Sequence, residues 1–385
     1  MHLHTVPADM AVLRNDLYNF CVSAGFTGVA MDTVTLTCGV LTGGDIRSLW
    51  PAGSGFFLMP FDVDASGYYA NSGKAFTAWR AVVKDPAGSC YIHLLFYSHG
   101  TSVPRRGVSG IPVFYVDCYI STGWDGSADA SPGICKACTW RNVPESFYGV
   151  DFYAGQTSEG RRWVHVALEE SPLVYNHMGF GSIEKTVDFT GGDFISPNGH
   201  MFIMQRHIQH GAYASFTTGP YNSGTVGYLQ PVMYAPDLDA PGKLRPGNLY
   251  RTIAGYFYDQ QLERPELDIG STSMRCTYSS ATPDAYDGGG GDLSVQTFPL
   301  PNPWSGTAPF LPIFVYASNA LDMKCKGAAG YFSGVRSVNV KNFNPGDEIT
   351  LGPDVWATYP VCAKPGVVPS GHDSGYQGYA VLKNG

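Results

Sequence analysis

The residues best suited to chemistry are a cysteine pair and three histidines. Cys135 and Cys138 are spaced as C-x-x-C, the spacing of many zinc and redox sites. A zinc site needs a second ligand pair, and a redox motif needs a strand-to-helix context; neither accompanies this pair. His200, His207 and His210 flank a strand-like apolar run, which does not force their imidazoles to converge. Packed thiols and solvated or interface histidines are favoured, and a metal or redox site is the open alternative.

Carboxylates gather at three places in the sequence. The segment 284–292, DAYDGGGGD, offers oxygen ligands of the kind that Ca²⁺ takes, but its spacing matches no standard calcium loop. Glu169 with Glu170, and Asp62 with Asp64, are the candidate pairs for glycoside hydrolysis, which needs two carboxylates across a cleft. We expect the glutamates to be exposed at a hairpin turn.

Motifs of nucleophilic or nucleotide-dependent enzymes are missing as well. The sequence contains neither a G-x-S-x-G nucleophile motif nor a phosphate-binding G-x-x-x-x-G-K-[ST] loop. A hydrolase that uses the acidic pairs is the weakest of the alternatives. The prediction is a protein that is not an enzyme, with no catalytic residues, no cofactor and no bound metal.

The amino-acid composition indicates which class of partner the protein binds. Charged residues make up 15% of the 385 residues, against roughly 25% in ordinary domains, while aromatic residues reach 14%. Such a surface suits contacts with other protein subunits. The formal net charge of −8 does not indicate the positively charged surface that binds nucleic acid. The sequence shows no signal peptide and no apolar run of roughly 18 residues, so we expect a soluble protein without membrane insertion. Nine scattered cysteines indicate free thiols.

Glycine and proline predict the fold class. The 47 glycines and 27 prolines imply frequent turns, which favour many short strands. We therefore predict a mainly β protein of antiparallel sandwich or barrel-like domains with long loops. Strands are predicted at 34–37, 55–59, 90–96, 111–116 and 201–205. Turn-rich composition marks 121–160 and 271–310 as long loops or boundaries, which divides the chain into three units, 1–160, 161–310 and 311–385.

One amphipathic helix is predicted over residues 7–25. Its apolar positions recur every three or four residues, and Arg14 is placed on the polar side. Thr5 is the predicted cap, and Gly25 ends the helix. The apolar face comprises Met10, Leu13, Leu17, Phe20, Cys21 and Ala24.

A β-hairpin is predicted over the stretch 160–181, GRRWVHVALEESPLVYNHMGFG. Trp163, His165 and Ala167 alternate with Val164, Val166 and Leu168, so both faces of the first run are predicted to be covered. A four-residue turn, 169–172, leads to a second run over 173–178, which pairs antiparallel with the first.

This hairpin resembles a part of tailed-bacteriophage virion structural proteins. The shared elements are an arginine-led run at 161–166, Tyr175, the pair Gly179-Phe180, and Gly191-Gly192. The opening is similar too, with Leu17, Phe20 and Gly25 at the end of a short helix. The segments 351–360, with its Trp-x-x-x-Pro, and 374–381, with its Gly-Tyr-Ala, look like the ending of many tail and baseplate proteins.

The resemblance implies a subunit of a phage tail or baseplate that is made in the cytoplasm of the bacterial host and assembled into the virion. It would form a symmetric homo-oligomer and bridge other tail or baseplate proteins. The alternative is a receptor-binding module for host-surface glycan. Aromatic residues in turn-rich segments are the predicted contact residues: Trp124, Trp140, Tyr221, Tyr228 and Trp304.

Overall fold

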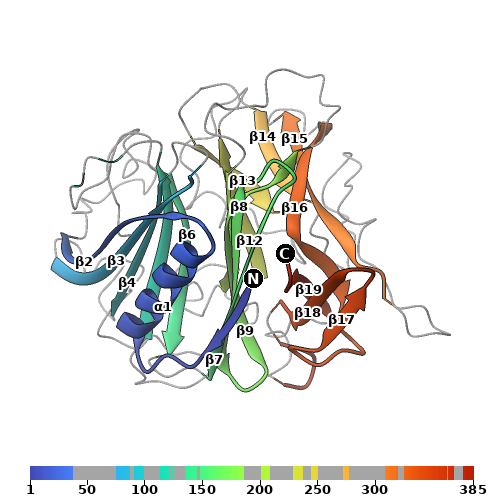
Figure 1. Ribbon diagram of the computed structural model, residues 1–385, viewed down its shortest axis with the longest axis horizontal. Coiled ribbons are helices and arrows are strands. Elements are labelled where there is room, and N and C mark those ends of the chain that lie inside the picture. The colour runs from blue at the N-terminus through green and yellow to red at the C-terminus, as the bar shows by residue number, and fades with distance from the viewer. Residues whose placement is uncertain are drawn as a thin grey trace, which may run out of the picture.

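The computed structural model shows a mainly β protein with one helix near the N-terminus among the residues that it describes (Figure 1). This confirms the predicted fold class. The described residues are 1–37, 75–86, 91–98, 113–121, 124, 126, 135–144, 148–185, 201–208, 229–236, 244–249, 272–276, 308–319, 325–361, 363–367 and 376–385.

The strands form two sheets. The five-stranded sheet pairs its strands antiparallel in chain order: β2 (Thr27–Thr37), β3 (Ala75–Lys84), β4 (Tyr91–Ser98), β5 (Val113–Ser121) and β6 (Cys135–Pro144). The 14-stranded sheet begins with β1 (His2–Thr5), β7 (Gly149–Gln156), β8 (Arg162–Ser171), β9 (Val174–Ser182), β11 (Met201–Ile208), β12 (Leu229–Pro236) and β13 (Leu244–Leu249). It continues with β14 (Thr272–Cys276), β15 (Leu311–Asn319), β16 (Cys325–Asn339), β19 (Gln377–Leu382), β18 (Asp354–Pro360) and β17 (Glu348–Leu351), and β10 (Glu184–Lys185) pairs with β16. Its pairs are antiparallel except β13 with β14.

The helix α1 (Met10–Ser23) begins later than the sequence predicts. Its N-cap is Asp9, whose side chain accepts a hydrogen bond from the Val12 amide at 2.8 Å. The predicted cap, Thr5, is wrong because this residue belongs to β1, where its hydroxyl donates to Asp16. Gly25, at a φ of +95°, lets the chain turn away from the helix end as predicted.

Helix α1 buries its apolar stripe between the two sheets. Its core residues share one cluster with side chains from β3 to β5 and from β7 to β9. Both sheets therefore turn an apolar face toward α1, and this cluster is the main core of the molecule. The predicted face is confirmed for Met10, Leu13, Leu17, Phe20 and Cys21.

Arg14 is the exception on this helix. Placed on the polar side by the sequence, it is buried, and its guanidinium donates to the backbone carbonyls of Asp32 and Arg80 at 2.9 and 3.2 Å. An arginine can enter the core here because strand carbonyls satisfy its donors. This corrects the predicted exposure of Arg14.

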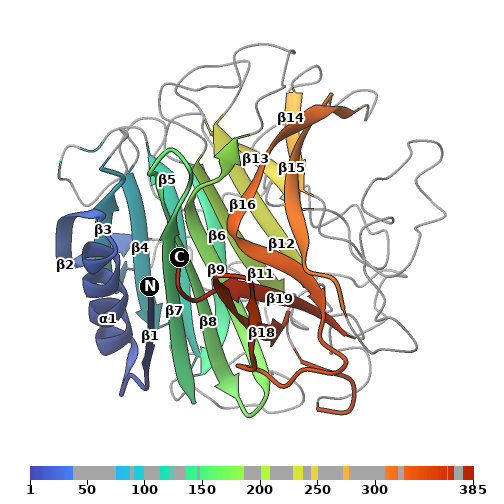
Figure 2. The ribbon, with the colours of Figure 1, turned by 45° about the vertical axis from the view of Figure 1, so that its right-hand side comes forward.

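The second face of β7, β8 and β9 is covered by the C-terminal strands. Figure 2 shows β16, β18 and β19 beside these strands, on the side away from α1. In β8, Val164 and Val166 face the main core, whereas His165 faces Tyr379 of β19. The β8–β9 hairpin is thus covered on both faces, which confirms that prediction.

The hairpin turn is tighter than predicted. Strand β8 runs through Ser171 and pairs it with Val174, so the turn is Pro172-Leu173 instead of four residues. A register shift between Glu169 and Ser171 leaves Glu170 in a bulge, where its carboxylate is buried and accepts a hydrogen bond from Asn176. The expected exposure of Glu170 is therefore wrong.

The segment 121–160 is also more ordered than its composition suggests. It contains β6 and β7, and residue 160 lies in the turn between the paired strands β7 and β8. Strand β14 lies inside the second turn-rich segment, 271–310. The predicted strands at 34–37, 90–96, 111–116 and 201–205 overlap β2, β4, β5 and β11, and the one at 55–59 lies outside the described residues. The division into three units stays a prediction.

Candidate functional site

Three exposed apolar residues lie at one end of the 14-stranded sheet. Val6, Tyr148 and Leu173 are 62%, 58% and 48% exposed, and together we call them the apolar rim. Val6 follows β1, Tyr148 precedes β7, and Leu173 lies at the tip of the β8–β9 hairpin. Figures 1 and 2 both show the β8–β9 hairpin and the start of β7 at the lower end of the molecule.

Neighbouring strands hold the rim together. The Tyr148 amide donates to the Glu169 carbonyl at 2.8 Å, and the Leu173 amide donates to the Glu169 carboxylate at 2.8 Å. Glu169 thus fixes two rim residues at once. An apolar group fixed in solvent loses the free energy that burial would supply.

Leu173 is held in an unfavourable backbone conformation. Its φ is +62°, and among the described residues it is the only residue other than glycine with a positive φ. A left-handed conformation costs an ordinary residue about 1–2 kcal/mol, and glycine or asparagine would suit this turn better. Strain of this kind is concentrated at functional positions. Leucine here combines strain with exposure, so neither the turn nor the core explains it.

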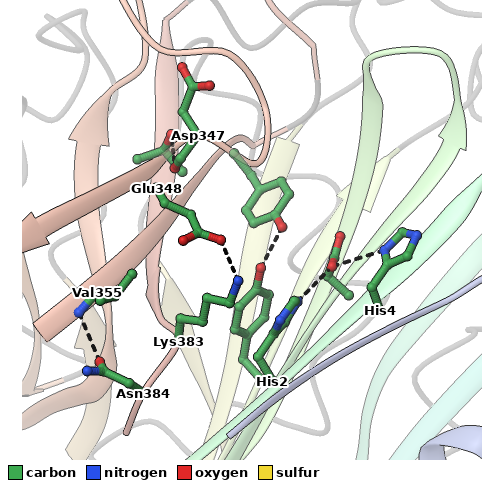
Figure 3. A network of polar contacts seen from close by, with 11 residues as sticks. His2, His4, Asp347, Glu348, Val355, Lys383 and Asn384 are labelled. Atoms are coloured by element: carbon green, nitrogen blue, oxygen red, sulfur yellow. Dashed lines mark hydrogen bonds and ion pairs between the residues drawn. The ribbon is translucent and has the colours of Figure 1, made fainter.

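A polar network lies at the edge formed by β1 and β7 (Figure 3). One carboxylate oxygen of Asp151, Oδ1, is 2.8 Å from His2 Nε2 and 3.1 Å from His4 Nδ1. Burial on its own would raise the pKa of Asp151, but the His2 hydrogen bond and the nearby His4 outweigh it and lower that pKa. The network therefore keeps a carboxylate charged and anchors β1 to β7.

The network continues across the layer boundary to β18. The Tyr153 and Tyr359 hydroxyls are 2.6 Å apart, and the His2 ring stacks on Tyr153 with ring centroids at 4.6 Å. Burial raises the pKa of both tyrosines, so their hydroxyls stay neutral. Nearby, Lys383 pairs with Glu348 (Figure 3). These contacts join β1 and β7 to the C-terminal strands.

Two buried histidines lie deeper in the same boundary. His165 Nε2 is 3.1 Å from His177 Nδ1, and His177 Nε2 is 2.9 Å from the Pro360 carbonyl oxygen. Both imidazoles are fully buried, with Tyr379 ring centroids 5.8 and 5.0 Å away. Alternation in β8 and β9 predicts that His165 and His177 point to one face, but only the tertiary structure shows Pro360 there.

Trp124 lies on the face of the five-stranded sheet opposite to α1, beside Arg80 and His93. The Arg80 guanidinium is 5.1 Å from the Trp124 ring centroid, and the Tyr91 and His93 rings make edge contacts with it at 6.3 and 5.8 Å. Arg80 also holds Asp32 with two hydrogen bonds of 2.8 and 2.6 Å. This predicted contact residue is half-buried and forms an aromatic surface beside a fixed ion pair.

Of the other predicted contact residues, only the backbone of Trp140 lies within the described part of the chain. Trp140 lies in β6, paired with Val116 of β5. Tyr221, Tyr228 and Trp304 lie outside the described residues. The set stays a prediction as a contact surface. The rim residues were missed because a single Val, Tyr or Leu in a turn carries no periodic signal.

The candidate chemical groups divide in the same way. Cys135 and Cys138 lie in β6, with Cys138 opposite Cys118, a buried free thiol, and a strand is not the setting of a redox motif. His207 lies in β11. The remaining candidates, His200, His210, Asp62, Asp64 and the segment 284–292, lie outside the described residues.

Metal-binding groups, membrane-spanning helices and similarity to known proteins also bear on the function. Within the described ranges, no group of three or more His, Cys, Asp or Glu side chains is arranged to hold a metal ion. No helix in the described part of the chain is long and apolar enough to span a bilayer. No protein-family model matches the chain, and no curated protein matches it in sequence. The function therefore has to be argued from the surfaces described above.

Proposed function

We propose that this chain is a structural subunit of a tailed-phage tail or baseplate, not an enzyme, which assembles through the apolar rim into a symmetric multimer and bridges neighbouring components. Leu173 is the observation that carries the proposal. An exposed leucine that also holds a costly backbone conformation makes sense if a neighbouring subunit covers it. The resemblance of the hairpin and the C-terminal segments to virion structural proteins supplies the setting.

The layered fold supports the same proposal. An antiparallel sandwich covered on both sides leaves the strand ends and turns as its contact surface. Val6, Tyr148 and Leu173 stand at such an end, and tyrosine is enriched at subunit contacts. Hydrogen bonds that Tyr148 and Leu173 donate to Glu169 hold these two residues in place before a partner arrives, which lowers the entropy cost of association.

Replacing Leu173 with asparagine tests the rim. Asparagine tolerates the left-handed conformation, so the isolated subunit should become more stable by about 1 kcal/mol. Self-association should weaken by about tenfold or more, because a central apolar contact is lost. Urea denaturation measures the first effect, and sedimentation equilibrium of the purified protein measures the second.

The matched control is Met31→Gln on β2, where Met31 is 44% exposed away from the rim. This variant should leave self-association unchanged. If Leu173→Asn and the double variant Leu173→Asn/Tyr148→Ser associate as the parent does, the rim is not the contact surface. Mass spectrometry of purified phage particles tests the virion assignment itself. Absence of this protein from the particles would overturn that assignment.

The second candidate is a host-glycan receptor-binding module, favoured by Trp124. The Trp124 ring lies beside Arg80, which orients the exposed carboxylate of Asp32, so the site offers a stacking surface together with an acceptor for sugar hydroxyls. If this candidate is right, Trp124→Ala should weaken binding to host-surface polysaccharide by about tenfold or more. Fluorescence titration of the purified protein with that polysaccharide is the measurement. Tyr376→Ala, at an exposed aromatic residue elsewhere, is the control.

A further inference from the structure

The buried histidine pair has one consistent arrangement of protons. The Pro360 carbonyl can only accept a hydrogen bond, so Nε2 of His177 carries the proton that it donates. Nδ1 of neutral His177 is then an acceptor, and Nε2 of His165 must donate to it. Both imidazoles are thus neutral, with the proton on Nε2 in each. The chain of donors runs from β8 through β9 to the end of β18.

An additional proton on either imidazole has no favourable position in this arrangement. On His165 it would have to go to Nδ1, which is buried and has no hydrogen-bond partner among the described residues. On His177 it would occupy Nδ1, so the hydrogen bond of the pair would survive only if His165 accepted through Nε2 and moved its own proton to Nδ1, which has no partner. A buried charge without a partner is costly, so lowering the pH destabilises the packing of the two layers.

We propose that the His165–His177 pair is an acid-operated latch, in which protonation releases the layer of β18 and β19 from the face of β7, β8 and β9. The pair donates to the last residue of β18, and its aromatic wall includes Tyr379 of β19 and Tyr359 of β18. The opposite face of β8 and β9 is held separately by the main core with α1. Release therefore acts on one side of these strands.

The C-terminal strands can separate as a body because they have a small core of their own. That core contains Val338, Val340, Trp356 and Ala380, with Phe310 and Phe343 packed against it. The antiparallel pairing of β16, β19, β18 and β17 does not depend on either histidine. Acid thus removes a docking contact and leaves the apolar contacts within the layer in place.

The titratable groups around the pair do not offset the charge. Each neighbouring strand contributes a tyrosine: Tyr153 of β7, Tyr175 of β9, Tyr359 of β18 and Tyr379 of β19. Burial raises the pKa of Tyr153, Tyr175 and Tyr359, so these hydroxyls stay neutral in acid.

Carboxylates lie one shell further out, near the tyrosines: Asp151, Glu169 and Glu348. Asp151 already binds His2 and His4. Among the described residues, the hydrogen bond of His165 is to His177 and its ring contacts are with His177 and Tyr379, so none of these carboxylates compensates a charge on it.

The pH window follows from the direction of the shift. Burial, with a smaller contribution from His177, holds the pKa of His165 well below its ordinary value of 6.5. A histidine with a lowered pKa in the folded state stabilises fully above its unfolded value and loses this stability as the pH falls below it. Below about pH 6.5 the equilibrium constant for docking of β18 and β19 on β7–β9 should therefore fall by about tenfold per pH unit for each such histidine.

Hydrogen exchange at residue level, corrected for the intrinsic pH dependence of exchange, tests the latch in the full chain. Between pH 7.5 and pH 5.5, protection of β18 and β19 amides should fall by about tenfold or more while that of α1 stays within about twofold. In the variant His165→Gln/His177→Gln, which keeps donors and acceptors but cannot titrate, the pH dependence in β18 and β19 should disappear.

His93 provides the matched control. It is a buried histidine of β4 in the other sheet, where burial and the charge of Arg80 lower its pKa to about 3. His93→Gln should leave the acid response of β18 and β19 unchanged. Loss of protection in α1 to the same extent as in β18, or an acid response that survives in the double glutamine variant, would overturn the latch.

Imidazole ¹⁵N spectra of the parent protein keep the proposal testable if the double variant does not fold. Both histidines should show the proton on Nε2 at pH 7.5, and neither should become charged before the β18 amide signals change. A His165 that titrates near pH 6.5 with β18 still docked would refute the proposal.

Discussion

Replacing Gly334 with alanine is expected to lower the free energy of unfolding by about 2–3 kcal/mol. A methyl group at this position of β16 would overlap the Trp163 ring atoms Cζ2 and Cη2. Trp163 cannot withdraw, because it is 1% exposed and a Cβ built on Gly155 would already lie 2.5 Å from the same ring. Urea denaturation at pH 7.5 measures the change.

A second substitution tests whether the overlap with the Trp163 ring causes the loss of stability. In the background Trp163→Phe, which removes the outer part of the indole, Gly334→Ala should cost at least about 1 kcal/mol less than it does alone. Gly149→Ala is the control, because its Cβ would meet only the exposed His4 ring, at 2.9 Å. Equal costs of Gly334→Ala in the Trp163 and Phe backgrounds would show that the ring is not the cause.

Replacing Arg161 with methionine is expected to cost roughly 3–5 kcal/mol of stability. Arg161, next to the start of β8, forms an ion pair with Asp85, next to the end of β3, so the pair joins the two sheets. The Asp85 side chain is 0% exposed, and the variant would leave its charge buried. The unfolding free energy at pH 7.5 is again the measurement.

Two further variants separate the buried pair from ion pairs in general. Asp85→Asn combined with Arg161→Met should recover at least about 1 kcal/mol, because the buried charge of Asp85 is removed. Lys383→Met removes a solvent-exposed pair with Glu348 and should change stability by less than about 1 kcal/mol. An Arg161→Met variant no less stable than Lys383→Met would contradict the account.

The layers have different contents, and this difference bears on function. The core around α1 is apolar, while the boundary between β7–β9 and β18–β19 contains histidine and tyrosine side chains. Apolar contacts are insensitive to pH, whereas the buried histidines are not. If the proposed latch operates, the molecule keeps its main core while one layer responds to acid.

Periodicity carried most of what could be predicted. The three- and four-residue spacing of Met10, Leu13, Leu17 and Phe20 marks a helix with one buried face, because an α-helix repeats every 3.6 residues. Apolar residues at both alternating positions of 163–168 mark a strand covered on both faces. These signals are local, so they need no knowledge of the partner surface.

The errors occur where a distant residue decides the outcome. Arg14 reads as a surface residue until the carbonyls of Asp32 and Arg80 are known to lie beside it. Glu170 reads as a turn residue until the bulge in β8 turns it toward Asn176. A polar side chain is buried when partners exist, and sequence spacing alone does not show these partners.

The sequence by itself determined the β-rich class, the N-terminal helix and the hairpin, because repeat periods and turn residues act over a few neighbours. Tertiary structure alone decided the candidate sites. Leu173 joins Val6 and Tyr148 only through strand pairing, and His177 reaches Pro360 across 183 positions of the chain. Such contacts depend on how layers stack, and stacking reflects the summed burial and packing of the whole molecule.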